Sequence, residues 1–166
     1  ILAVFFDWSD GKIAKRIKSR TDNQRMFGGQ LDSLIDIVSF GVCPAIVLLS
    51  YGDFNPWFIP GAFIIVSAGV LRLSYFNVYG LVGESSYQGL AIDNNGIFLA
   101  LLFVFHDLVS TSVFTTLLYL VILALAVLNV APIRTPKLGM GWYYGVSAYS
   151  LALILFFGWQ LLPENV

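Results

Sequence analysis

Long apolar stretches separated by short polar segments dominate the sequence. Four of these stretches have the length of about 20 residues that a helix needs to span a bilayer. They cover residues 30–50, 56–79, 110–131 and 141–162, and a fifth, interrupted and polar at its start, covers residues 90–107. The pattern predicts an all-α fold, namely a polytopic bundle of transmembrane helices.

A further apolar run opens the chain and ends at Asp7. It is too short to span a bilayer, so we interpret it as the end of a helix whose upstream part is missing, which brings the expected number of helices to about six. Short turn signals separate the stretches, and no linker, repeat or low-complexity segment interrupts them. We therefore expect a single integral-membrane domain over residues 1–166.

Composition supports a membrane setting. Hydrophobic residues make up 58% of the chain and charged residues 11%, with a mean hydropathy of +0.81, whereas soluble domains carry about 25% charged residues. The single cysteine, Cys43, excludes an internal disulfide and a thiol metal site. The net charge of −1 identifies no partner, and no nucleic-acid partner is expected.

The basic residues predict an orientation, because Lys and Arg collect on cytoplasmic loops. If the helices alternate in direction, all nine basic residues fall on one side of the membrane, and the opposite loops around 51–55 and 106–110 contain none. We therefore expect a multi-pass protein of the cell membrane. Its first polar loop and the acidic cluster described next would face the cytoplasm.

Four carboxylates and three small residues recur at helical spacing near the start of the chain. They are Asp7, Asp10, Gly11, Ala14, Gly28, Asp32 and Asp36. The first four positions form one helical stripe, and the last three, spaced by four residues, form another. The two stripes can face each other across a helical hairpin.

A cluster of carboxylates at membrane depth needs compensating cations. Carboxylate oxygens suit Mg²⁺ or Mn²⁺, and the sequence has no His or Cys cluster that would suggest zinc. Alternatively, single aspartates cap helices or pair with Lys12, Lys15 or Arg16. The number and spacing of the carboxylates favour a divalent-cation site that handles phosphate.

These residues resemble the signature of the CDP-alcohol phosphotransferase family, which reads D-x2-D-G-x2-A-R-x8-G-x3-D-x3-D. Two departures are visible: Lys15 replaces the family's arginine, and twelve residues rather than eight separate it from Gly28. Arg16 is the alternative candidate for the arginine's role. The nearest likeness is to the phosphatidylserine synthases, carried by the run at 38–45, by 71–78 and, weakly, by Gly89 and Leu90.

The resemblance implies an activity and a set of partners. A phosphatidyl group would pass from CDP-diacylglycerol to the hydroxyl of L-serine, with release of CMP, in phospholipid biosynthesis. The family also implies a homodimer. Sister enzymes that use inositol phosphate, glycerol phosphate or choline stay open as alternatives, as does a divalent-cation transporter, which the concentration of acidic residues at one depth disfavours.

The resemblance also assigns roles to residues. Asp7, Asp10, Asp32 and Asp36 would hold a pair of divalent cations, and Asp36 would accept the proton of the attacking hydroxyl. The expected substrate-binding residues are Gly11, Ala14, Lys15, Arg16, Gly28 and Arg72.

Arg72 and Asp93 each allow two interpretations. Arg72 lies about 24 Å along its predicted helix, near the cytoplasmic face, where it either reaches the membrane surface or holds a phosphate or the serine carboxylate. Asp93 either lines the amino-alcohol side of the site or caps the interrupted helix, and we favour the cap.

Overall fold

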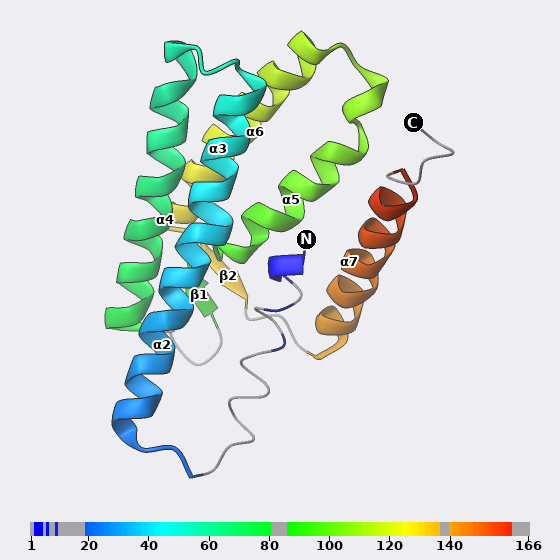
Figure 1. Cartoon of the computed structure of the whole chain (residues 1–166). Helices are drawn as coiled ribbons and strands as arrows, with labels where there is room; N and C mark the ends of the chain where they lie inside the picture. Colours follow the sequence, from blue (N-terminus) through cyan, green and yellow to red (C-terminus); the bar gives the residue numbers. More distant parts are fainter. Residues whose placement is uncertain are drawn as a thin grey trace. The chain divides into compact units, whose positions relative to one another are not determined.

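The computed structural model describes residues 2–4, 6, 9, 19–80, 86–136 and 140–160. The chain divides into two compact units, Thr21–Lys137 and a smaller unit that joins Ile1–Arg20 with Leu138–Val166. The larger unit is a bundle of helices, which confirms the all-α fold class (Figure 1). The single domain over residues 1–166 stays a prediction.

One long helix opens the bundle. It consists of α2 (Asp22–Ile37), a π-helical segment η1 (Val38–Val42) and α3 (Cys43–Tyr51), which together run for 30 residues. The helix begins earlier than the apolar stretch at 30–50 because a capping box nucleates it: the Gln24 N–H donates to Thr21 Oγ1 at 3.3 Å, and the Thr21 N–H donates to Gln24 Oε1 at 2.9 Å.

The other helices of the bundle follow the predicted stretches. A 3₁₀ turn, η2 (Pro56–Phe58), leads into α4 (Ile59–Tyr79). The next helix is α5 (Asp93–Val104), which is followed by the 3₁₀ turn η3 (His106–Leu108). The last helix of the bundle is α6 (Thr111–Val130). In the described part of the chain, three segments are long and apolar enough to cross a membrane. They are Asp22–Tyr51, Pro56–Tyr79 and Thr111–Val130.

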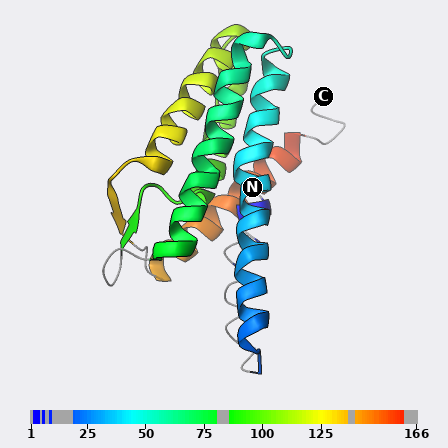
Figure 2. The same cartoon turned by 90° about the vertical axis from the view of Figure 1, so that its left-hand side faces the viewer.

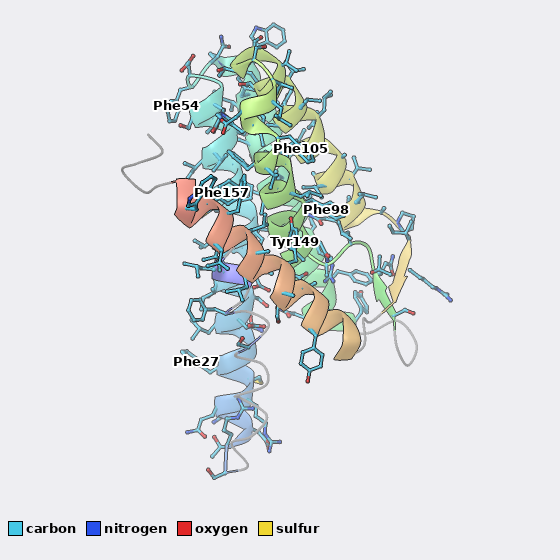
Figure 3. The ribbon with its side chains drawn as sticks, turned by 90° about the vertical axis from the view of Figure 1, so that its right-hand side faces the viewer. Phe27, Phe54, Phe98, Phe105, Tyr149 and Phe157 are labelled. Atoms are coloured by element: carbon cyan, nitrogen blue, oxygen red, sulfur yellow. The ribbon has the colours of Figure 1, made fainter. Side chains whose placement is uncertain are left out.

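The smaller unit contains α7 (Met140–Gln160), which confirms a helix in the stretch predicted at 141–162. Its described apolar part, Tyr144–Trp159, is shorter than the three spans above. Tyr149 and Phe157 project from this helix in Figure 3.

A two-stranded ribbon, which the sequence pattern did not predict, closes one end of the bundle. Strands β1 (Ser86–Gln88) and β2 (Arg134–Pro136) pair antiparallel, with Tyr87 opposite Thr135. We call this the ribbon end, and the opposite end, formed by residues 52–58 and 105–110, the loop end (Figure 1). Figure 2 shows that the first turns of α2 extend past the ribbon end of α4.

The core lies where α3, α4 and α6 meet. Leu48, Ile65, Phe114, Leu118 and Ile122 are completely buried there. Gly61 permits the close approach of α6, because a methyl group at this position would overlap the ring of Tyr119. The packed core fixes α4 and α6 against each other, and the candidate site lies toward the ribbon end of these helices.

Candidate active site

The second predicted stripe lies on one continuous helix. Gly28, Asp32 and Asp36 all belong to α2 and follow each other at one-turn spacing, so they share a face. Asp32 is exposed and Asp36 is half-buried. Within the described part of the chain, no atom of another element lies within 4 Å of the position that a Gly28 Cβ would take. There is therefore room for a group beside Gly28 on this face.

Two other sides of α2 have different surroundings. Ser33 and Ile37 face α4: the Asn77 Nδ2 donates to Ser33 Oγ at 3.0 Å, and Ile37 packs on Gly69. A further side is apolar and exposed, and Figure 3 shows Phe27, which is 70% exposed, pointing away from the bundle. The helical period thus separates the carboxylate face from both the packed side and the apolar side.

Three elements that carry charged residues meet at Gly69 of α4. A methyl group at Gly69 would lie 2.8 Å from Ile37 Cδ1 and 2.7 Å from Ile92 Cδ1. Asp36 precedes Ile37, Asp93 follows Ile92, and Arg72 lies less than one turn beyond Gly69. The small residue at position 69 therefore brings one aspartate, one arginine and a second aspartate to the same level of the bundle.

Arg72 is buried at this level, with only 6% of its surface exposed. Its Nε donates to the carbonyl oxygen of Leu90 at 3.1 Å, and its guanidinium carbon lies 5.4 Å from the centre of the Phe76 ring. An arginine that reached the membrane surface would expose its guanidinium, so this interpretation is wrong. The hydrogen bond and the cation–π contact instead fix the orientation of the guanidinium inside the protein.

The Leu90 carbonyl is itself held by the ribbon end. The Leu90 N–H donates to Leu128 O at 2.9 Å, the Gly89 N–H donates to Ile133 O at 2.8 Å, and Thr135 Oγ1 donates to Gly89 O at 2.7 Å. Gly89 has a φ of +75°, which favours glycine. The segment that positions Arg72 is thus attached to the end of α6 and to β2.

The favoured interpretation of Asp93 is wrong. The N-cap of α5 is Ile92, which makes no side-chain capping bond, and Asp93 is the first residue inside the helix. The Asn94 Nδ2 donates to Asp93 Oδ1 at 3.3 Å, and a negative charge in the first turn interacts favourably with the helix dipole. The other interpretation, in which Asp93 lines the amino-alcohol side of the site, stays a prediction.

Two buried asparagines lie near this level: Asn95, which accompanies Asp93 at the start of the interrupted helix, and Asn129, which the sequence analysis missed. Asn95 of α5 has no exposed surface and donates from Nδ2 to Phe40 O at 3.1 Å, and Asn129 of α6 is 1% exposed. Each is an amide within or at the end of an apolar stretch. A polar amide surrounded by apolar residues in a stretch of membrane-spanning length is the sequence signal that could have identified both residues.

The first predicted stripe and its neighbours lie outside the described residues. They are Asp7, Asp10, Gly11, Ala14, Lys15 and Arg16. Among the residues that the structure describes, no three His, Cys, Asp or Glu side chains come together. Asp32 and Asp36 offer oxygen ligands of the kind that Mg²⁺ or Mn²⁺ accepts, so they fit a divalent-cation site that other ligands would complete.

The family profile described as CDP-alcohol phosphatidyltransferase matches residues 1–160. This chain belongs to the CDP-alcohol phosphatidyltransferase family. The match spans nearly the whole chain and confirms the resemblance carried by the acidic stripes.

Curated relatives from this family cover most of the chain. Archaetidylserine synthase of Methanothermobacter thermautotrophicus is 35% identical over 85% of this chain and 58% of its own length. CDP-diacylglycerol–serine O-phosphatidyltransferase of Methanocaldococcus jannaschii is 31% identical over 93% of this chain and 70% of its own length. Phosphatidylcholine synthase of Rhizobium johnstonii is 27% identical over 93% of this chain and 64% of its own length. The chain thus spans little more than half of the first relative.

Proposed function

We propose that this chain transfers a phosphatidyl group from CDP-diacylglycerol to the hydroxyl of L-serine and releases CMP, as a phosphatidylserine synthase. The observation that carries the proposal is that Gly28, Asp32 and Asp36 share one face of α2, while Gly69 brings the end of α2 to the level of the buried, oriented Arg72. Two of the relatives above bear names of serine-specific enzymes, which supports serine as the acceptor.

A divalent-cation site is part of this proposal. Asp32 and Asp36, together with Asp7 and Asp10, would hold Mg²⁺ or Mn²⁺, with two ions expected from the family resemblance. When bound, such ions neutralise a diphosphate and stabilise the departing nucleotide.

The protein residues have distinct tasks in the transfer. Asp36 accepts the proton of the serine hydroxyl, whose oxygen then forms a bond to the lipid-bearing phosphorus while the bond from that phosphorus to CMP breaks. Arg72 orients a phosphate or the serine carboxylate through its fixed guanidinium. Gly28 leaves room for the diphosphate beside the helix. Gly11 and Ala14 admit the cytosine ring, and Lys15 or Arg16 contacts the nucleotide.

The reaction centre faces the cytoplasm in this proposal. Arg25 lies in the first turn of α2, Arg72 in the second half of α4 and Arg134 in β2. These parts of the three elements lie toward the ribbon end (Figure 1), and the loop-end segments 52–58 and 105–110 contain no Lys or Arg. Because basic residues mark the cytoplasmic side, the ribbon end and Asp36 are assigned to it. We assign the protein to the cell membrane and, from the family resemblance, expect a homodimer.

The experiment that tests the activity is CMP release by purified protein in detergent, with Mg²⁺ or Mn²⁺. The donors are CDP-diacylglycerol and its archaeal counterpart, CDP-archaeol, and the acceptors are serine, choline, inositol phosphate and glycerol phosphate. Serine-dependent release supports the proposal. Choline-dependent release would assign the chain to the activity named for its Rhizobium relative, and release with no acceptor would contradict the proposal.

A further inference from the structure

A proline interrupts the hydrogen bonding of the long helix just beyond the proposed reaction centre. Pro44 lies within the 30-residue helix, and a proline has no N–H to donate to the carbonyl of the residue four positions earlier, which is Phe40. The helix is π-helical at this point: the Cys43 N–H donates to Val38 O, five residues back. The wider turn accommodates the proline without ending the helix.

A side chain from another helix supplies the donor that Pro44 lacks. The Asn95 Nδ2 of α5 donates to Phe40 O at 3.1 Å, and both residues are buried, with exposed fractions of 0% and 2%. A backbone carbonyl inside a membrane protein needs a partner because no water is available there. The Asn95 amide therefore compensates for the missing N–H of Pro44.

This bond lies close to the residues proposed to act in catalysis. Phe40 follows Asp36 by one helical turn, and Asn95 lies in the first turn of α5, two residues beyond Asp93. A π-helical turn adds one residue, so it rotates the preceding helix by about 100° relative to the following one. The geometry of this turn consequently sets the direction in which α2 presents its carboxylates relative to the packed α3.

We propose that Asn95 is a positioning residue for phosphatidyl transfer. By donating to the Phe40 carbonyl, it holds the π-helical turn at Pro44, and this turn fixes the rotation of α2 that directs Asp36 toward the substrate. The catalytic part of this inference rests on the proposed function, whereas the pairing of the Asn95 amide with the Phe40 carbonyl does not.

The test is a double-mutant cycle of Asn95→Ala and Pro44→Ala, read by the unfolding midpoint Tm and by kcat and KM. Alanine at position 44 restores an N–H that can donate to Phe40 O. Asn95→Ala alone should lower Tm and reduce kcat about 10-fold or more, with the KM for CDP-diacylglycerol changed less than about 2-fold. In the Pro44→Ala background, the same substitution should change both Tm and kcat much less.

The matched control is Asn129→Ala, because Asn129 is an equally buried amide on α6 that is not bonded to Phe40. Its effect should be the same with Pro44 and with alanine at position 44. Equal effects of Asn95→Ala in both backgrounds would overturn the donor role. The positioning role would be overturned if the effect of Asn95→Ala on Tm depended on the residue at position 44 while kcat did not change in any variant. A rise in the KM for serine alone, without a fall in kcat, would also overturn it.

The two readouts separate this inference from the proposed function. If the wild-type protein releases no CMP with any acceptor, the proposed function and the positioning role both fail. The Tm cycle still decides whether Asn95 replaces the donor that Pro44 lacks.

Discussion

The guanidinium of Arg72 is held by a backbone carbonyl and an aromatic ring inside the bundle. Lysine keeps the charge but lacks the planar fork, so Arg72→Lys should lower kcat about 100-fold. The matched control is Arg25→Lys, because Arg25 is an exposed arginine that pairs with the exposed Asp22 at 3.6 Å within the first turn of α2. Turnover measured as CMP release, together with Tm, checks the prediction. Wild-type turnover in Arg72→Lys would remove Arg72 from the reaction centre.

Gly28 and Gly29 are adjacent on α2, and within the described chain a methyl group at either would meet nothing within 4 Å. Each glycine-to-alanine change should therefore raise stability by up to about 1 kcal/mol through helix propensity. At about 100° per residue, Gly28 and Gly29 both project within about 60° of the direction midway between Asp32 and Asp36, so alanine at either position should lower activity if the substrate lies against this face. Tm and CMP release measured on both variants check this. Full activity in Gly28→Ala would show that the substrate does not approach α2 at this position.

The sequence could not reveal how single polar residues are used, because their roles depend on contacts that are distant along the chain. Arg72 is buried rather than snorkelling because Leu90, 18 residues later, offers its carbonyl. Asp93 is not a cap because the helix already begins beside Ile92. Asn95 has its partner 55 residues earlier, beyond the reach of any local pattern.

At the scale of elements, the packing glycines of α4 allow a matched comparison. Gly69 lies where Ile37 and the segment before α5 converge, and Gly61 lies against Tyr119 toward the loop end. Alanine at either position should lower Tm, because the added methyl group displaces packed side chains. Gly69→Ala should also lower kcat, since it shifts the helix that carries Asp36. If Gly69→Ala and Gly61→Ala had equal kcat values, measured well below the Tm of each variant, the packing at Gly69 would not be what positions the reaction centre.

Apolar patterning predicted the helices well because bilayer-length hydrophobic runs specify them directly. The same pattern missed the first turns of α2, where the capping box rather than burial starts the helix. It also missed the ribbon, whose three-residue strands are held by contacts of Gly89 and Leu90 with the end of α6. The π-helical turn could not be predicted from Pro44 alone, because a proline can also end a helix and the sequence does not show that this helix continues past Pro44.

At the scale of the whole molecule, orientation is open to direct measurement. In a Cys43→Ser background, Asp53→Cys places a thiol at the loop end, and Asp22→Cys places one at the start of α2, toward the ribbon end. A membrane-impermeant maleimide should label the first variant in intact cells and the second only after permeabilisation. The reverse pattern would put the ribbon end outside the cytoplasm and would contradict the assigned orientation.

In the proposed reaction, a lipid-linked substrate would reach the carboxylates of α2 from the membrane, and a soluble acceptor would reach them from the cytoplasm. The most direct measurement is serine-dependent CMP release by Asp36→Asn, compared with Asp22→Asn, which neutralises an exposed aspartate on the same helix. Loss of the proton acceptor should lower kcat at least about 100-fold in Asp36→Asn, while Asp22→Asn keeps near wild-type turnover. Wild-type turnover in Asp36→Asn would contradict a reaction centre on α2.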